Sequence, residues 1–225
     1  MNSWYLKPQA KMAMAVSAVN PYLFTFIYFC ITFLQTFVQG VLETGSRLME
    51  RSGDFRGAEI LLPAMIIFAV VQFILTTWLG AGYVSYCLKV ARKDSSMSYL
   101  DLFSSYRYLL KAMGLSVMTG IFVFLWSLLF IIPGIIASYR YSQALRILVD
   151  DPSKGIFQCI RESKEMMAGN KMDYFLLELS FLPWNLLSLV TCGLSIIYVM
   201  PYQGVTLALY YDKIKPRPYE EAENI

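Results

Sequence analysis

Four ionisable side chains lie inside long apolar segments of this sequence. Arg140 and Arg146 occupy one segment, and Asp173 and Glu178 occupy the next. Even permissive insertion scales assign a cost of about 2.5–3.5 kcal/mol to an arginine at the middle of a membrane span. An Arg140–Glu178 or Arg146–Glu178 ion pair would reduce that cost. One interpretation is a structural clasp in which Arg146 snorkels to the interface; the other is a polar cavity, open to the cytoplasm, that binds an anionic group.

Amides and prolines occur in the same part of the chain. Asn185 and Gln203 would line such a cavity, or would only join helices through hydrogen bonds. Pro183 and Pro201 interrupt the fifth and sixth apolar segments, and broken helices expose backbone groups that transporters use for ligand sites. The candidate ligand-binding or structural polar cluster is therefore Arg140, Arg146, Glu178, Asn185 and Gln203.

The segment from Phe124 to Asp151 predicts a tight helical hairpin. It begins as an apolar run, breaks at Pro133-Gly134 and continues as a second apolar run that carries the two arginines. The returning arm, 135–149, is only roughly 22 Å long at 1.5 Å per residue. It therefore either crosses a locally thinned bilayer or enters and leaves on the same side.

The residues that common enzyme mechanisms need are missing from this sequence. There is no histidine, no Gly-x-Ser-x-Gly, no Asp-x-x-Asp and no phosphate-binding loop, and the four cysteines form no Cys-x-x-Cys. We therefore expect a protein that is not an enzyme and has neither a metal nor a cofactor. The net charge of +3 is slight, so we expect no nucleic-acid partner.

The composition is that of a membrane protein. Of the 225 residues, 57% are hydrophobic and only 16% are charged, whereas soluble domains are about a quarter charged. Several apolar windows reach the ~20 residues that a membrane-spanning helix needs. The first apolar run follows Lys7 and Lys11 and is too long for an ordinary signal peptide, so we interpret it as a retained span.

The sequence pattern predicts a single all-α membrane domain over 1–212, followed by a cytoplasmic tail over 213–225. Two amphipathic segments, about 96–112 and 153–169, place apolar residues on one helical face and predict interfacial helices. The six predicted transmembrane helices cover about 21–42, 60–88, 115–132, 135–149, 172–190 and 194–211.

The distribution of basic residues predicts the orientation. With six spans and a cytoplasmic N-terminus, the outer loop holds only Arg47, Arg51 and Arg56, which leaves 16 of the 19 Lys and Arg residues inside. A returning arm that did not cross would move the basic residues from Arg140 to Lys171 outside. The positive-inside rule therefore favours six spans with both termini in the cytoplasm.

The sequence pattern predicts an internal repeat in the second half of the chain. Trp126-Ser-Leu-Leu followed by Gly134 matches Trp184-Asn-Leu-Leu followed by Gly193, and an amphipathic segment precedes each motif. Two copies in the same orientation would be related by an axis along the membrane normal. The recurring unit would be one interfacial helix followed by one helical hairpin.

Several motifs follow one another in an order that resembles a known family. They run from Trp126 through Ile132-Pro133-Gly134 to Asp150-Asp151, then Glu162-Ser-Lys-Glu-Met-Met-Ala-Gly-Asn-Lys171, and end at Tyr210-Tyr211. This order resembles the bacterial integral membrane proteins catalogued as domain of unknown function 975. More remotely it is similar to the membrane domain of some glycerophosphodiester phosphodiesterases. The resemblance implies a six-span bacterial plasma-membrane protein of unassigned activity, and it supplies no catalytic residues.

Two functional hypotheses remain open from the sequence. The first is a non-enzymatic membrane module whose basic, amphipathic cytoplasmic face binds lipid, for example anionic lipid, or a membrane or cytoplasmic protein partner. The alternative is a small transporter or export accessory with a polar site around Arg140 and Glu178. Transport requires a polar cavity inside the helices, whereas a binding module requires a packed interior.

Overall fold

The computed structural model describes residues 3–52, 55–191 and 193–216, and all regular elements in these ranges are helices. This confirms the expected all-α fold. In chain order the elements are η1 (Ser3–Tyr5), α1 (Leu6–Ala15), α2 (Pro21–Arg51), α3 (Phe55–Ala91), η2 (Tyr99–Tyr108), α4 (Leu109–Leu129), α5 (Ile131–Tyr141), α6 (Ala144–Asp150), α7 (Ile156–Met166), α8 (Lys171–Leu179), α9 (Leu182–Val190) and α10 (Ile196–Ile214).

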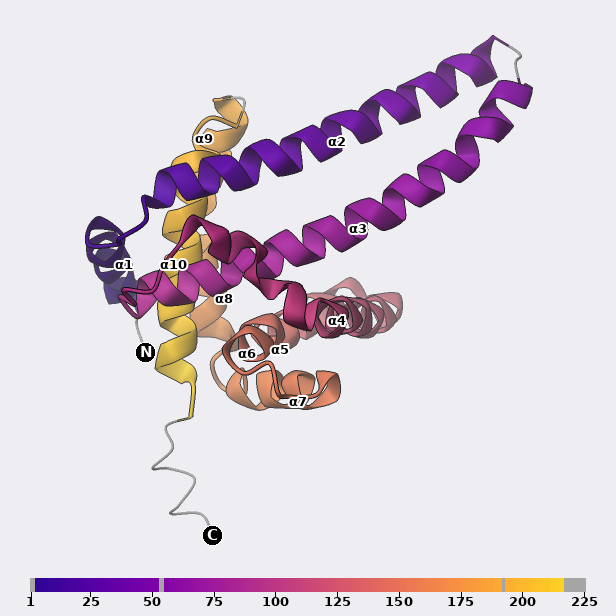
Figure 1. Cartoon of the computed structure of the whole chain (residues 1–225). Coiled ribbons are helices and arrows are strands. Elements are labelled where there is room, and N and C mark those ends of the chain that lie inside the picture. The colour runs from indigo at the N-terminus through magenta and orange to yellow at the C-terminus, as the bar shows by residue number, and fades with distance from the viewer. Residues whose placement is uncertain (1–2, 53–54, 192, 217–225) are drawn as a thin grey trace.

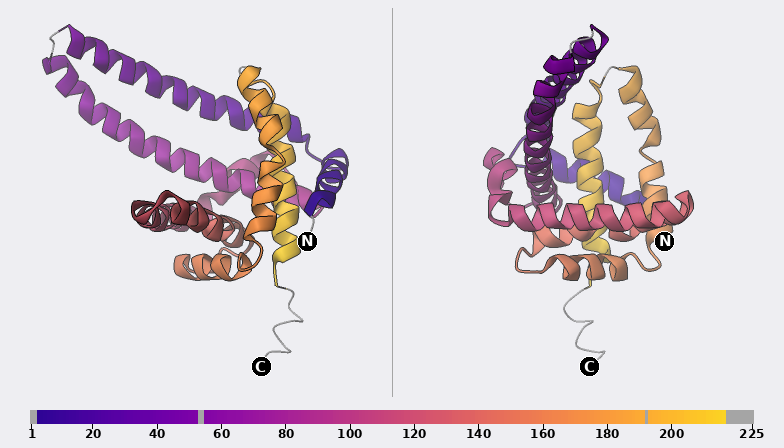
Figure 2. Two further views of the ribbon diagram at one scale, coloured as in Figure 1. Left: turned by 180° about the vertical axis from the view of Figure 1, so that it is seen from behind. Right: turned by 90° about the vertical axis from the view of Figure 1, so that its right-hand side faces the viewer.

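Three helix hairpins, here called arms, project from a common root (Figure 1). The first arm pairs α2 with α3, the second pairs α4 with α5, and the third places α8 and α9 beside α10. Figure 2 shows the arms pointing in three different directions, with α4 lying across the direction of the upright α10. The helices therefore do not form the single bundle expected of six parallel spans. A shorter helix (α1, η2 or α7) precedes each arm, as the repeat would require, but the repeat itself stays a prediction.

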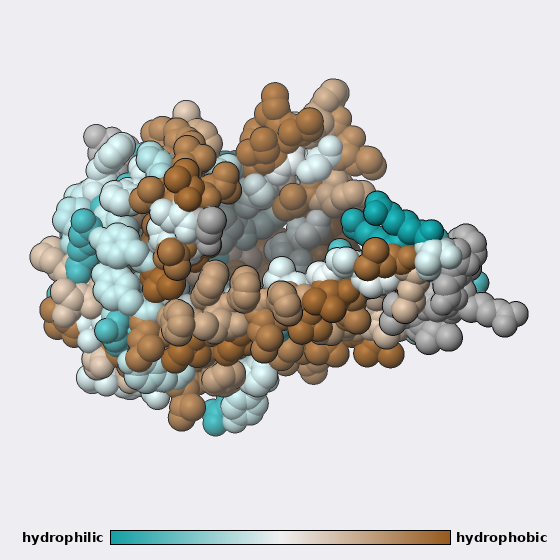
Figure 3. Space-filling view, turned by 90° about the horizontal axis from the view of Figure 1, so that it is seen from above, coloured by the Kyte–Doolittle hydropathy of each residue, from teal (hydrophilic) through white to brown (hydrophobic). Residues whose placement is uncertain are grey.

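The arms carry the membrane-embedded surface. Three helical stretches are long and apolar enough to cross a membrane: Pro21–Arg51, Leu62–Ala91 and Tyr99–Leu129. Apolar side chains at the tips of the second and third arms are not covered by other parts of the protein, since Ile131 is 77% exposed and Leu189 is 82% exposed. Figure 3 shows apolar side chains along the first arm and hydrophilic ones gathered at its far end and at the root. Apolar surface of this extent indicates a membrane-embedded protein; the count of six spans stays a prediction.

The first arm is longer than its apolar core. Asn20 starts α2, because its side-chain oxygen accepts from the backbone N–H groups of Tyr22 and Leu23 at 3.0 and 3.3 Å. α2 then continues to Arg51. The helix thus continues nine residues beyond the predicted end of the membrane span at residue 42, and that limit of the span stays a prediction. Glu43 accepts a hydrogen bond from Gln39 at 2.9 Å and lies 3.9 Å from Arg47, so helix-stabilising pairs extend the helix into the polar segment.

The interfacial helix expected over 96–112 has a different form. Residues Tyr99–Tyr108 form a 3₁₀ helix, η2, and α4 starts directly after it at Leu109. Ser98 and Asp101 form a capping box at its start. Ser105 then donates from its hydroxyl to the Trp78 carbonyl at 3.0 Å, which ties η2 onto α3. The helix type and bounds therefore differ from those predicted, while the interfacial location of this segment stays a prediction.

The returning arm is not one helix. The chain reverses at Phe130, so Pro133 and Gly134 lie in the first turn of α5 rather than at the turn itself. The helix then breaks at Ser142–Gln143, which corrects the predicted single span over 135–149. Ser163 of α7 fits this break, because its hydroxyl donates to the Arg140 carbonyl at 2.9 Å and accepts from the Gln143 N–H at 3.2 Å.

The fifth predicted span, 172–190, is also divided, with α8 ending at Leu179 and α9 starting at Leu182. Pro183 is in the first turn of α9. Lys7 of α1 donates to the carbonyl of Ser180 at 3.0 Å, and its ammonium lies 4.2 Å from the centre of the Phe181 ring. Pro201 lies inside α10, which continues through it. The predicted interruption of the sixth helix at Pro201 is therefore wrong.

Aromatic packing holds the arms together at the root. Phe24 of α2 stacks on Tyr86 of α3 with ring centres 3.7 Å apart, and the Tyr86 hydroxyl donates to the Val19 carbonyl at 3.2 Å. The Tyr210 hydroxyl of α10 donates to the Asn170 carbonyl at 2.9 Å.

The helix α7, at Ile156–Met166, is shorter than the amphipathic helix predicted over 153–169. Of the predicted tail, residues 217–225 lie outside the described residues.

Candidate functional site

A network of charged side chains joins the root ends of α3, α6 and α10. The guanidinium of Arg92 donates to Asp150 Oδ1 at 2.6 Å and to Asp212 Oδ1, also at 2.6 Å. Asp150 Oδ2 accepts from the Tyr211 hydroxyl at 3.0 Å and from the Lys215 ammonium. Three helices that are distant in sequence are thereby fixed at one point.

Asp150 is the centre of this network. Its side chain is only 9% exposed. Burial favours the neutral acid, but hydrogen bonds from Arg92 and Lys215 favour the carboxylate more strongly, and the pKa of Asp150 falls to about 2. The hydrogen bonds from Arg92 to Asp212 raise the pKa of the Arg92 guanidinium, against the effect of its own partial burial. Asp150 and Arg92 are therefore both charged at neutral pH.

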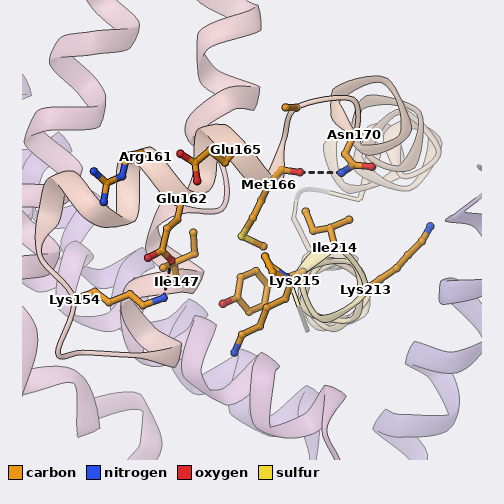
Figure 4. Close-up of a pocket in the computed structure, with 13 residues that line it drawn as sticks. Ile147, Lys154, Arg161, Glu162, Glu165, Met166, Asn170, Lys213, Ile214 and Lys215 are labelled. Carbon is orange, nitrogen blue, oxygen red and sulfur yellow. Dashed lines mark hydrogen bonds and ion pairs between the residues drawn. The ribbon is translucent and has the colours of Figure 1, made fainter. Parts of the chain in front are cut away.

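A cleft of about 1010 Å³ lies beside the network, between α7 and α10 (Figure 4). We call it the base cleft. Apolar side chains, Ile147, Met166 and Ile214, lie between its two walls, and charged side chains surround them. The charged side chains that line the cleft are Lys154, Arg161, Glu162, Glu165, Lys213 and Lys215.

The cationic side chains of the base cleft differ in whether a carboxylate of the protein is paired with them. Lys154 lies 2.6 Å from Glu162, and Lys215 pairs with Asp150 of the root network. Lys213 points away from α7 in Figure 4, and its ammonium lies 5.4 Å from the centre of the Tyr5 ring. Arg161 is exposed on the α7 wall, and none of the carboxylates that the structure describes lies within ion-pair distance of it. Arg161 is therefore the cation best placed to receive an external anion.

The structure does not bring the five sequence-predicted side chains into one site. Arg146 and Gln203 line a second, smaller cavity between α3, α6 and α10. Neither Arg140 nor Arg146 forms an ion pair with Glu178 in the part of the chain that the structure describes. Instead, Tyr174 lies between Arg146 and Glu178 and interacts with both. Asn185 is exposed on α9, away from both cavities.

Sequence reasoning missed the residues of the root network and Arg161. A signal for the network is present in the sequence. Arg92, Asp150 and Asp212 each follow the inner end of a predicted span, after the second, fourth and sixth respectively. Opposite charges at the same membrane level predict ion pairs between helix ends. Arg161 has no comparable signal, because charged residues on an amphipathic helix are usually only solvated.

In the described ranges, no group of three or more His, Cys, Asp and Glu side chains could hold a metal ion. The expected absence of a metal and of a cofactor stays a prediction.

A family model matches most of the chain. The family model described as "Protein of unknown function (DUF975)" matches residues 1–136 and residues 128–218. No curated protein and no solved structure matches the chain.

Proposed function

The chain belongs to the DUF975 family of proteins of unknown function, and on that premise we propose that it is a non-enzymatic membrane module that binds anionic phospholipid headgroups at its base cleft. Its three long apolar helices make it a membrane-embedded protein. The proposal extends to a bacterial plasma membrane, six spans and cytoplasmic termini, for which the basic residues of the inner segments are the support.

The base cleft is the observation that carries this proposal. A phospholipid presents a charged phosphate next to apolar carbon, and the cleft offers cations beside Ile147, Met166 and Ile214. α7 lies beside the lower end of α10 (Figure 1), with Cys159, Ile160, Ser163 and Met166 buried and Arg161 exposed. If the root faces the cytoplasm, as the basic residues predict, Arg161 lies at the level of the inner headgroups.

The alternative of a small transporter or export accessory has less support. Its proposed site required Arg140, Glu178 and Asn185 to line one polar cavity. Arg140 is half-buried on α5 without an ion pair to any described carboxylate, and Asn185 is exposed on α9. A protein partner at the same cleft is an outcome that the following experiment distinguishes.

The test measures binding of a soluble short-chain lipid to the full-length protein in detergent. We expect dioctanoyl phosphatidylglycerol to bind more tightly than dioctanoyl phosphatidylcholine. Replacing Arg161 with Gln should weaken phosphatidylglycerol binding about fivefold, since one basic residue at an anionic surface contributes about 1 kcal/mol. Microscale thermophoresis of labelled protein gives both dissociation constants.

The matched control is Arg51→Gln at the far end of α2, which removes the same charge on a distant exposed site and should change neither affinity. Equal affinity for the two lipids, or equal losses in the two variants, would refute lipid binding at the base cleft and leave a protein partner as the candidate occupant.

A further inference from the structure

We propose that the second cavity, between α3, α6 and α10, binds the anionic end of a single-chain amphiphile, an alkyl carboxylate or alkyl phosphate, through Arg146. This cavity has a volume of about 200 Å³ and shares no lining residue with the base cleft. The inference is therefore independent of lipid binding at that cleft.

The walls of the cavity are mainly apolar. α10 approaches α3 closely at Gly204, where a Cβ atom would lie 2.7 Å from Cys87 Sγ and 3.3 Å from the Tyr83 ring. Met200 and Leu207, on either side of Gly204 along α10, supply apolar walls. Polar groups are limited to a few side chains, chiefly the Arg146 guanidinium and the Gln203 amide. This combination suits a ligand with one charged end and an apolar body.

Arg146 brings a positive charge that its protein neighbours do not neutralise. Its guanidinium donates to the Ser142 carbonyl and to Gln143 Oε1, both at 3.2 Å, and it interacts with Tyr174. These partners are neutral, and no carboxylate in the described residues lies within ion-pair distance of Arg146. Gln143 is fully buried, so its Oε1 is a fixed acceptor for the guanidinium. A charge next to apolar walls and without a counterion is costly, and an anionic ligand would remove that cost.

The cavity volume restricts the size of the ligand. An engineered cavity of about 150 Å³ holds benzene, so a cavity of about 200 Å³ accommodates a carboxylate or phosphate with several methylene groups. It does not accommodate a two-chain phospholipid. The cavity is not fully enclosed, so a longer alkyl chain can extend out of it.

The test uses radiolabelled octanoate and the full-length protein in nanodiscs of neutral phosphatidylcholine, with empty nanodiscs subtracted. We expect saturable binding at one site. Unlabelled octanoate and octyl phosphate should both compete with the labelled octanoate. The one that competes at the lower concentration shows whether the cavity prefers a carboxylate or a phosphate. Competition by octanol as strong as that by octyl phosphate would overturn the proposal, because it would mean that only the alkyl chain is recognised.

Variants at two arginines assign the charge. Arg146→Gln should weaken octanoate binding at least about tenfold, the effect expected when a charge-assisted hydrogen bond is removed. Arg140→Gln removes the same charge on the neighbouring helix, outside the cavity, and should have no effect. Equal binding by the two variants would overturn the proposal. Arg161→Gln should also leave octanoate binding unchanged, which separates this site from the base cleft.

A second variant keeps the test valid if Arg146→Gln does not fold. Ala208→Leu narrows the cavity from the α10 wall and leaves the guanidinium in place. The thermal unfolding midpoint reports whether this variant is folded. A folded Ala208→Leu protein should lose octanoate binding, whereas undiminished binding would contradict the assignment of the site to this cavity.

Discussion

At the scale of single residues, Asp150 has the greatest influence on the root. Four side chains from two other helices depend on its carboxylate or share its partners: Arg92, Tyr211, Asp212 and Lys215. Removing one partner of a largely buried ion pair leaves the others without their counterion, which is more destabilising than losing an exposed pair. The stability of the root should therefore depend on pH through this residue.

Asp150→Asn should destabilise the protein by about 2 kcal/mol at neutral pH, because the pKa of Asp150 falls from its ordinary 3.8 to about 2 on folding. A folded-state pKa below the unfolded one stabilises at pH values above about 4, and this stabilisation is lost as the pH falls toward 2. Thermal unfolding in detergent, measured between pH 7 and pH 2, should show a higher unfolding midpoint for the wild type than for Asp150→Asn at neutral pH. This difference in midpoint should shrink as the pH falls from about 4 toward 2.

Glu50→Gln is the control for this measurement, since Glu50 is exposed at the far end of α2 and has no ion pair to the described residues. Its unfolding midpoint should follow that of the wild type at every pH. A constant difference between wild type and Asp150→Asn down to pH 2 would contradict the role given to the carboxylate.

At the scale of elements, close contact between η2 and α3 depends on Gly82. A Cβ atom at this position would meet the backbone of Leu102 in η2, with the Leu102 Cα at 2.9 Å. A backbone cannot move aside as a flexible side chain can. The 3₁₀ helix is therefore held against α3 by a residue without a side chain.

Gly82→Ala should destabilise the protein by about 1–3 kcal/mol, the usual cost of overpacking. Gly80→Ala in the same helix has no atom within 4 Å of the added Cβ, so it should be neutral or slightly stabilising through helix propensity. Chemical unfolding of the two variants side by side provides the comparison. Equal stability of the two would mean that η2 does not lie on α3 at this point.

The elements also show which features can be predicted from sequence. The apolar segments that became α2, α3 and α4 were recognised, because length and hydropathy are properties of the segment itself. The breaks at Ser142–Gln143 and near Ser180 were missed, since Ser163 and Lys7 satisfy backbone groups there from distant parts of the chain. Among the candidate site residues, Arg146 and Gln203 do share a cavity, but Tyr174, rather than a direct ion pair, lies between Arg146 and Glu178.

At the scale of the whole molecule, charged side chains lie at the root and at the far end of the first arm, and apolar surface lies between them. α1, α7 and the end of α10 gather at the root with the charged network, and hydrophilic side chains gather at the far end of the first arm (Figures 1 and 3). The tips of the second and third arms are apolar, as the exposed Ile131 and Leu189 show. The end of α2, at Arg51, lies at the far end of the first arm (Figure 1). If the root faces the cytoplasm, as the basic residues predict, this end of α2 faces the outside.

Single cysteines test this orientation in intact cells. In a background where Cys30, Cys87, Cys159 and Cys192 are replaced by serine, Ser52→Cys at the end of α2 should react with a membrane-impermeant maleimide. Ser153→Cys, in the exposed segment before α7, should react only after permeabilisation. Labelling of both positions from outside would exclude the six-span topology with a cytoplasmic root.

The contact between Lys7 and Ser180 also has a consequence for biosynthesis. The two residues are 173 positions apart, so at an elongation rate of about 5–20 residues per second α1 waits roughly ten seconds or more for its partner. During that interval the apolar face of α1, with Leu6, Ala10, Ala13 and Met14, cannot pack against α10, because α10 has not been made. α1 is thus synthesised well before its partner helix and is among the last elements to reach its final place, so its apolar face needs another contact until translation of α10.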